Sequence, residues 1–413
     1  VLNDIIFSLA DWSKVNANAS GCDHVTAKPV EITDEKQNKY FKWGQEKFAY
    51  DVLASDKIGP RRPLDPMYHT LCKNLSYDDI KLSASIVIIY HNEALSVLIR
   101  MINSILDRTP SEYLKEIVLF DDYSHDDCII REKLLEYGLV EKWPLNKIIN
   151  ERSEKRNGLI RARMAAADLA SGDVLIFLDS HCEVTERWIE PLLKTIQEDR
   201  KRVVLPVIDL INPMKFDYSQ AMIAKMSFDW RLSFNWVYFP WEYFDIPEHN
   251  YQPFRQVIYL TLNKLVGQRT PMMSGGLFAI DKNYFYEMGG YDKGMEIWGG
   301  ENIEMSLRIW LCGGSIVVHP CSRVGHLFRM RRPYQSKAGL DTNLYNTVRA
   351  AKVWFDEYQK YFYHRRPDAL KMNVGDLTER LELKKKLGCK PFKWFIEEID
   401  PSLKPKERLE DEL

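Results

Sequence analysis

Several common sequence signatures are missing from this 413-residue chain. It contains neither GxGxxG nor GxxxxGK[ST], so the sequence supports neither a dinucleotide-binding loop nor a P-loop. Its seven cysteines are scattered and form no CxxC pair, which argues against a zinc ribbon or a thioredoxin-type site. No apolar run reaches the roughly 18 residues that a membrane-spanning helix needs. The formal net charge of −2 argues against a protein that grips nucleic acid by bulk charge.

The N-terminal sequence also lacks targeting features. Residues 1–12 have no basic region and no cleavage site, so they do not form a signal peptide. The chain begins with Val1 rather than Met, from which we expect a fragment or a processed form, with room for a lost N-terminal anchor. Two N-x-S/T sequons, at Asn18 and Asn74, lie in polar stretches and favour a secretory location only weakly.

Beyond a polar, irregular arm over residues 1–80, with some helix around 35–50, apolar segments alternate regularly between strand and helix spacing. The spacing predicts strands over 85–90, 116–120, 147–150, 174–178 and 202–208, and helices over 95–106, 127–136, 158–169 and 187–198. Strand-helix alternation of this kind predicts a parallel sheet covered by helices, an α/β architecture.

Polar clusters follow three of the predicted strands. His91-Asn92-Glu93 follows the first, Asp121–Ser124 the second, and Asp179-Ser180-His181 the fourth. In α/β sheets the ligand lies outside the carboxyl ends of the strands. Loops are polar anyway, so each cluster alone has a plain alternative; together they indicate one cleft.

The Asp179-Ser180-His181 cluster is a candidate metal site. In an extended segment side chains two apart share a side, so Asp179 and His181 aim at one point. A carboxylate with an imidazole and no thiolate suits Mn²⁺ or a related ion that also takes phosphate oxygens. The alternative is that Asp179 caps the next helix and His181 packs. His326, after a β-rich run over 315–319, offers a third ligand.

Three arginines close to His326 predict that a diphosphate binds beside the metal. Arg329, Arg331 and Arg332 supply guanidinium groups suited to a diphosphate. Since no glycine-rich cradle is present, a metal bridging the phosphates is the natural means of neutralising the leaving group.

Over about residues 40–400 the chain resembles a known family. The segments that carry the resemblance are HNEA, DDYS, R-x-GLIRAR, FLDSHCE, MSGGLFAI, WGGEN, CSRVGH and LGCKPFKW, in this order. They are similar to the catalytic domain of polypeptide N-acetylgalactosaminyltransferases, which start mucin-type O-glycosylation in the Golgi lumen. The resemblance implies a GT-A fold with a Rossmann-like, mostly parallel sheet, and Mn²⁺ bound by Asp179, His181 and His326 together with UDP-GalNAc.

The resemblance also implies roles at the donor site. The resemblance implies that the uracil and ribose bind near His91, Asp122 and Arg156 and that Arg329 and Tyr334 bind the pyrophosphate. Ser180 is also expected in the donor site. The Gly275-Gly276 pair would let the backbone approach the sugar closely, the alternative being a plain turn. Ser274, before this pair, departs from the Ala that is often found there.

The reacting centre is expected at residues 298–302. The resemblance implies that Glu301 binds sugar hydroxyls and that Trp298 closes over the diphosphate, with Asn302 counted as a catalytic candidate. The alternative for Glu301 is charge complementarity at a helix N-terminus. The family retains anomeric configuration, by front-face attack, which we prefer, or by double displacement with a carboxylate nucleophile; the sequence leaves both open.

Aromatic residues and cysteines complete the expectations drawn from the resemblance. Phe234, Trp236 and Phe328 are expected to form a pocket for prolines of Ser/Thr-containing polypeptide acceptors, although so aromatic a segment is usually core. The expected disulfides are Cys72–Cys321 and Cys312–Cys389, which leaves Cys22, Cys128 and Cys182 unpaired.

The expected organisation is an N-terminal arm (1–80), a nucleotide-binding half (81–210), an acceptor and sugar half (211–345), and a C-terminal helical segment with tail (346–413). No QxW repeats occur, so no lectin domain is expected in this chain. The crossing at 255–271 is unusually apolar; it either patches the surface or narrows the acceptor groove. Two further alternatives are a transferase for another UDP-sugar and a weakly active relative serving as a binding module.

Overall fold

The structure is a computed structural model that describes residues 32–405 apart from 66, 126–129, 253–269, 335 and 338. Its strands are β1 (Ala84–Tyr90), β2 (Leu114–Asp121), β3 (Ile148–Arg152), β4 (Val174–Asp179), β5 (Cys182–Val184), β6 (Arg202–Ile211), β7 (Tyr218–Ser219), β8 (Ala224–Phe228), β9 (Phe234–Tyr238), β10 (Phe278–Asp281) and β11 (Ser315–Leu327). Its α-helices are α2 (Glu35–Phe48), α3 (Val52–Ile58), α4 (Leu95–Arg108), α5 (Ile130–Val140), α6 (Leu159–Leu169), α7 (Glu190–Glu198), α8 (Lys282–Glu287), α9 (Glu301–Leu311), α10 (Thr342–Trp354), α11 (Gln359–Arg365), α12 (Thr378–Lys386) and α13 (Phe392–Glu398).

One mixed sheet carries the fold. Across the described ranges its strand order is β3-β2-β1-β4-β10-β6-β11-β5, with β7 paired to β6, while β8 and β9 form a separate hairpin. The long ladders β1–β2, β1–β4, β2–β3 and β6–β11 are parallel. Strand β10 lies antiparallel between β4 and β6. The predicted α/β architecture is confirmed, and so are the predicted strand-helix pairs, with bounds that differ by a few residues.

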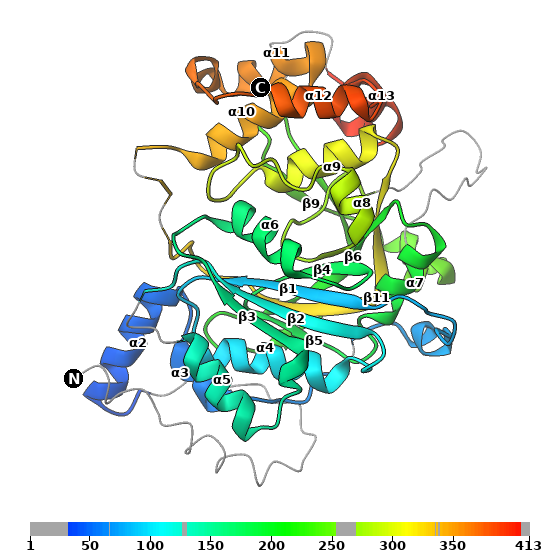
Figure 1. The fold of residues 1–413 in the computed structure, drawn as a ribbon. Coiled ribbons are helices and arrows are strands. Elements are labelled where there is room, and N and C mark those ends of the chain that lie inside the picture. Colours follow the sequence, from blue (N-terminus) through cyan, green and yellow to red (C-terminus); the bar gives the residue numbers. More distant parts are fainter. Residues whose placement is uncertain are drawn as a thin grey trace.

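Helices cover both faces of this sheet. Residues of β1 alternate between two cores: Ile86 and Ile88 belong to one, Val87 and Ile89 to the other. The alternation follows from the two-residue period of a strand, since both faces must be buried in a parallel sheet. Figure 1 shows α4 and α5 on one side of the sheet and α6 and α9 on the other. The two layers leave the carboxyl ends of β1, β2 and β4 at one edge, where the loops carry polar residues.

Strand β11 is longer than the predicted run of 315–319. It pairs with β6 along both of its parts, with a register shift between His319 and Arg323. Pro320 lies in this irregular part and has no backbone N–H to give to the ladder, which favours a bulge there. Beyond the shift β11 continues to Leu327, so His326 is held in a strand rather than in a loop.

Residues 32–80 apart from 66, the described part of the predicted N-terminal arm, contain the helix expected around 35–50 as α2 and a second helix, α3. Helix α2 begins at an N-cap, Asp34, which accepts a hydrogen bond from Gln37 N. Phe48, the last residue of this helix, and Tyr50, which follows it, pack in a core cluster with Val97 of α4 and Leu327 of β11. The segment that precedes β1 therefore reaches the end of β11.

Both expected disulfides are present. Cys72 pairs with Cys321 and Cys312 with Cys389, while Cys182 is buried and free. Cys22, Cys128 and residues 255–269 of the apolar crossing lie outside the described residues. No helix among the described residues has the length and apolar character needed to cross a membrane.

Candidate functional site

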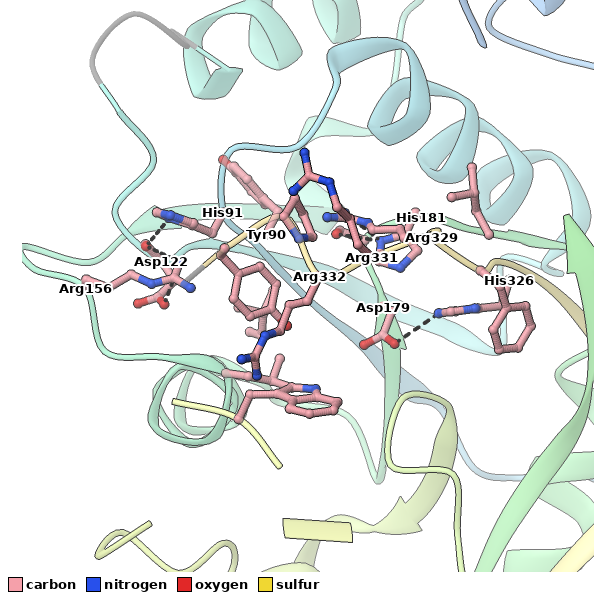
Figure 2. A pocket seen from close by; sticks show the side chains of 18 residues that line it. Tyr90, His91, Asp122, Arg156, Asp179, His181, His326, Arg329, Arg331 and Arg332 are labelled. Atoms are coloured by element: carbon pink, nitrogen blue, oxygen red, sulfur yellow. Dashed lines mark hydrogen bonds and ion pairs between the residues drawn. The ribbon is translucent and has the colours of Figure 1, made fainter. Parts of the chain in front are cut away.

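A pocket of about 360 Å³ opens at the carboxyl edge of the sheet. It is formed by the ends of β1, β2 and β4, the start of α6, the end of β11 and the loop that follows it (Figure 2). Most of the residues expected at the donor and metal sites line it: His91, Asp122, Arg156, Asp179, Ser180, His181, Trp298, His326, Phe328, Arg329 and Tyr334. The three polar clusters, which lie up to 90 residues apart in the sequence, therefore meet in one cleft, as predicted.

Asp179, His181 and His326 converge inside this pocket. Each offers a ligand atom, and these atoms lie within 4.8 Å of one another. His326 Nε2 is 3.3 Å from Asp179 Oδ2 (Figure 2). The convergence has a backbone cause: β5, directly after His181, pairs antiparallel with β11, which puts His326 opposite Cys182. Leu327 N also donates to His181 O at 3.1 Å.

The protonation states suit a divalent cation. Burial, followed by the nearby Arg329 charge, lowers the pKa of His181 to about 4, so its imidazole is neutral at pH 7. Burial alone would raise the pKa of Asp179, but the hydrogen bond from His326 and the Arg163 charge hold it below its usual range. An ionised carboxylate with a neutral imidazole is a donor set for such an ion. His326 Nδ1 is buried and has no hydrogen-bond partner among the described residues.

His91, Asp122 and Arg156 lie together at the other end of the pocket. The Asp122 carboxylate accepts hydrogen bonds from Asn157 N at 2.7 Å and from Gly158 N at 2.9 Å. Arg156 Nη1 is 3.3 Å from Asp122 Oδ2, and His91 Nδ1 is 2.9 Å from Asp122 O. Burial raises the pKa of Asp122, and burial together with Arg156 lowers the pKa of His91 to about 4. The three side chains present both donors and acceptors to the cleft.

The loop after β11 brings arginines and Tyr334 to the pocket. Two guanidinium groups face the Tyr334 ring: Arg156 lies 5.5 Å and Arg332 5.7 Å from its centroid. Arg332 also lies 5.3 Å from the centroid of the Trp298 ring, which is 38% exposed at the pocket rim.

Arg331 differs from the sequence-based expectation of a diphosphate ligand. Its Nη2 donates to the carbonyl oxygens of Gln45 at 3.0 Å and Glu46 at 2.9 Å, at the C-terminal end of α2. Gln45 O also accepts from Ala49 N of the C-cap at 3.2 Å, and the helix dipole makes this end attractive to a cation. The side chain borders the pocket, yet it anchors the loop to α2.

The Gly275-Gly276 pair is more than a turn. A Cβ on Gly276 would overlap Asp179 Oδ2, and one on Gly275 would lie 2.7 Å from Asn302 Cβ. Gly275 also has φ +83°, in the region that favours glycine. The backbone here therefore approaches the candidate metal ligand as closely as chain packing permits.

Glu301 and Asn302 lie behind this glycine pair and do not line the pocket itself. Glu301 is 5% exposed at the start of α9, and its Oε2 accepts from Gly299 N at 2.7 Å. Burial raises its pKa, with Arg163 acting in the opposite direction. Asn302 Nδ2 donates to Met273 O at 3.1 Å. The hydrogen bond from Gly299 N fits the alternative in which Glu301 serves the helix N-terminus. The charges of Arg163 and Asp179 also act on the Glu301 carboxyl, which links this residue to the site.

The three acceptor candidates do not form one pocket wall. Phe328 lines the pocket with its ring centroid 4.5 Å from that of His326. Phe234 and Trp236, on β9, contact each other edge to face at 5.4 Å and are not among the pocket-lining residues. Phe234 packs against the main core, while Trp236 is 37% exposed.

Two charged residues at the site escaped the sequence analysis as site residues. Arg163 of α6 is 2% exposed and donates to Asp179 Oδ1 at 2.9 Å and to Gly275 O at 2.5 Å. Glu93 is equally buried and accepts from His181 Nδ1 at 3.1 Å. Both lie in segments that carry the family resemblance: Arg163 in R-x-GLIRAR and Glu93 in HNEA. The sequence signal that could have identified them is a charged residue in an otherwise apolar or alanine-rich element, because a buried charge needs a partner.

Comparison with known proteins decides the family. A model described as Glycosyl transferase family 2 matches residues 85–288, and one described as N-terminal domain of galactosyltransferase matches residues 266–333. The chain is 52% identical to "Probable N-acetylgalactosaminyltransferase 8" of Caenorhabditis elegans over 95% of its own length and 88% of that protein. The chain belongs to the polypeptide N-acetylgalactosaminyltransferase family.

Other members are longer than this chain. "Polypeptide N-acetylgalactosaminyltransferase 11" of Xenopus tropicalis is 44% identical over 87% of this chain and 57% of its own length. The human "Polypeptide N-acetylgalactosaminyltransferase 16" is 41% identical over 92% of this chain and 65% of its own length. The chain thus spans less than two thirds of these two relatives.

A solved structure agrees with the family. The crystal structure of "GalNAc-T7 with UDP, GalNAc and Mn2+" matches with a TM-score of 0.80 and 37% identity, covering 92% of this chain and 68% of that one. Together with the family matches it confirms the GT-A fold that the motifs imply.

Proposed function

We propose that this member of the family is a retaining, Mn²⁺-dependent transferase that moves N-acetylgalactosamine from UDP-GalNAc to Ser/Thr hydroxyls of polypeptides and so starts mucin-type O-glycosylation. The observation that carries the proposal is the convergence of Asp179, His181 and His326 in the same pocket as His91, Asp122 and Arg156. A cation site beside a cleft with paired donors and acceptors matches the needs of a nucleotide diphosphate.

Asp179, His181 and His326 would hold the Mn²⁺. The fit rests on the ionised carboxylate, the neutral His181 ring and the His326 imidazole, whose buried Nδ1 has no hydrogen-bond partner among the described residues. Bound there, the metal supplies positive charge to the diphosphate leaving group. Arg163 holds Asp179 from behind, because it is buried and its guanidinium also binds Gly275 O.

The remaining roles follow the shape of the cleft. His91, Asp122 and Arg156 would bind the uridine, with Ser180 beside it. Arg329 and Tyr334 would bind the diphosphate, beneath Trp298. Arg329 is suited to an anion because its Nε is buried and, within the described part of the chain, has no hydrogen-bond partner. The sugar would lie against Gly275-Gly276, with Glu301 and Asn302 behind this pair. The full set of residues proposed to bind the donor is His91, Asp122, Arg156, Ser180, Arg329, Tyr334, Trp298, Gly275, Gly276, Glu301 and Asn302.

The acceptor side and the cellular setting are part of the same proposal. Prolines of the polypeptide would contact Phe328, Trp236 and Phe234. Residues 81–210 form the nucleotide-binding half and residues 211–345 the acceptor and sugar half, between the arm and the C-terminal helices. The two disulfides are compatible with the oxidising lumen of the secretory pathway, and the Golgi lumen is the proposed location.

A donor panel tests this function. The chain is incubated with Mn²⁺, a Thr/Pro-rich peptide and, in turn, UDP-GalNAc, UDP-GlcNAc, UDP-galactose or UDP-glucose, and the glycopeptide is measured by mass spectrometry. We expect transfer from UDP-GalNAc. Transfer from another donor alone would make the chain a transferase for that sugar. UDP binding without transfer from any of the four would favour a binding module.

A further inference from the structure

Glu93 receives more side-chain hydrogen bonds than any of the proposed metal ligands. Its Oε1 accepts from Tyr50 Oη at 2.6 Å, and its Oε2 accepts from Ser180 Oγ at 2.6 Å and from His181 Nδ1 at 3.1 Å. Arg329 Nη2 donates to the same Oε2 at 2.5 Å. The Glu93 side chain is 1% exposed, so this carboxylate is wholly committed to protein partners.

The contact with His181 fixes which ring nitrogen is available. A carboxylate accepts and cannot donate, so the Glu93 contact keeps the proton on Nδ1 and leaves the lone pair on Nε2. Metal-binding histidines are commonly oriented in this way by an outer carboxylate. Two further groups lie near Nδ1, Arg329 Nη2 at 3.2 Å and Ser180 Oγ at 3.3 Å. Both donate at shorter distance to Glu93 Oε2, at 2.5 and 2.6 Å, which leaves Oε2 as the acceptor for the proton on Nδ1.

Besides His181, three side-chain donors hold Glu93 itself: Tyr50, Ser180 and Arg329. Tyr50 is fully buried behind it, in the cluster that joins the segment after α2 to the end of β11. Arg329 comes from the loop after β11 and lies 5.7 Å from the centroid of the Tyr50 ring. The carboxylate is thus fixed from the N-terminal segment on one side and from the β11 loop on the other.

We infer that Glu93 is a positioning residue for the metal: it orients the His181 imidazole, and Tyr50 orients Glu93. The inference rests on the proposed function because it needs His181 as a metal ligand. Loss of such an outer partner costs about 10- to 100-fold in metal affinity. Loss of the single Tyr50 hydrogen bond should cost less, about two- to tenfold.

The test measures Mn²⁺ binding directly, without turnover. Free Mn²⁺ is followed by electron paramagnetic resonance while the whole chain is titrated, for the wild type, Glu93→Gln and Tyr50→Phe. The matched control for the first variant is Glu116→Gln: Glu116 is also buried and accepts from Ser85 and Ser171, near the amino end of β2. The control for the second is Tyr137→Phe, whose hydroxyl accepts from Asn103 on the α4–α5 side.

We expect the Mn²⁺ dissociation constant to rise 10- to 100-fold in Glu93→Gln and two- to tenfold in Tyr50→Phe, with both controls within about twofold of the wild type. A second readout is the ¹⁵N spectrum of the histidine rings, in which Glu93→Gln should shift the His181 signals toward the other tautomer. If Glu93→Gln does not fold, the Tyr50→Phe titration and spectrum decide.

Three results would overturn the inference. One is Mn²⁺ affinity in Glu93→Gln or Tyr50→Phe equal to that of its matched control. Another is complete loss of binding in Glu93→Gln, as in Asp179→Ala, since that would make Glu93 a direct ligand. The third is an unchanged His181 tautomer. A wild type that fails to bind Mn²⁺ would instead contradict the metal site of the proposed function, so the two failures are distinguishable.

Discussion

Removal of the Cys72–Cys321 disulfide should destabilise the protein more than removal of Cys312–Cys389. The first bridge spans a sequence separation of 249 residues and the second 77. In the chain-entropy model the stabilisation grows with the logarithm of loop length, which gives about 5.5 kcal/mol for the longer loop and about 4.5 kcal/mol for the shorter one. The expected difference in the free energy of unfolding is therefore about 1 kcal/mol, on losses that in practice reach about 2–5 kcal/mol.

Urea unfolding of two double variants measures this difference. Cys72→Ala/Cys321→Ala and Cys312→Ala/Cys389→Ala are compared with the wild type, each after a reversibility check, and with wild type reduced by dithiothreitol. Both variants should unfold at lower urea concentrations than the wild type, the first variant below the second, and the reduced wild type below both variants. A wild-type midpoint in either variant, or a larger loss from opening the shorter loop, would refute the reasoning.

Three further predictions concern the site. Glu301→Gln should abolish transfer while UDP and Mn²⁺ binding stay at wild-type levels in calorimetry; near-normal turnover would return Glu301 to a capping role. His91 has a folded pKa of about 4, below its ordinary value, so the unfolded chain binds the extra proton. Its contribution to stability is therefore retained above pH about 6.5 and falls as the pH drops toward 4; His91→Gln should show a smaller drop in melting temperature between pH 7 and pH 5, and an equal drop would contradict this. Gly276→Ala should weaken Mn²⁺ binding in titration, because its Cβ would displace Asp179, and unchanged affinity would contradict the close approach.

The sequence predicts the local elements well because periodicity is a local property. The strand of 85–90 and the helix of 95–106 appear as β1 and α4 with nearly the predicted bounds. The insertion of β10 antiparallel between β4 and β6 was not predicted, since pairing between distant strands leaves no mark on the spacing of either strand.

The candidate site could likewise be predicted best where neighbouring residues in the sequence define it. Asp179 and His181 could be paired from their two-residue spacing, and His326 could be added as a third candidate ligand. Its position opposite Cys182 depends on a register that only the folded β5–β11 pair defines. The direction of Arg331 could not be predicted, because the carbonyls that it binds belong to residues 45 and 46, far away in the sequence. The acceptor assignment of Phe234, Trp236 and Phe328 remains a prediction.

Metal dependence of transfer is the most direct test of the central claim that Asp179, His181 and His326 hold a cation for the transfer of N-acetylgalactosamine. Transfer from UDP-GalNAc to a Thr/Pro-rich peptide is measured after treatment with a chelator and again after addition of excess Mn²⁺, for the wild type and Asp179→Ala. The wild type should lose transfer in chelator and regain it with Mn²⁺, while Asp179→Ala stays inactive in both conditions. Full transfer by the wild type in excess chelator, or by Asp179→Ala with Mn²⁺, would contradict the account.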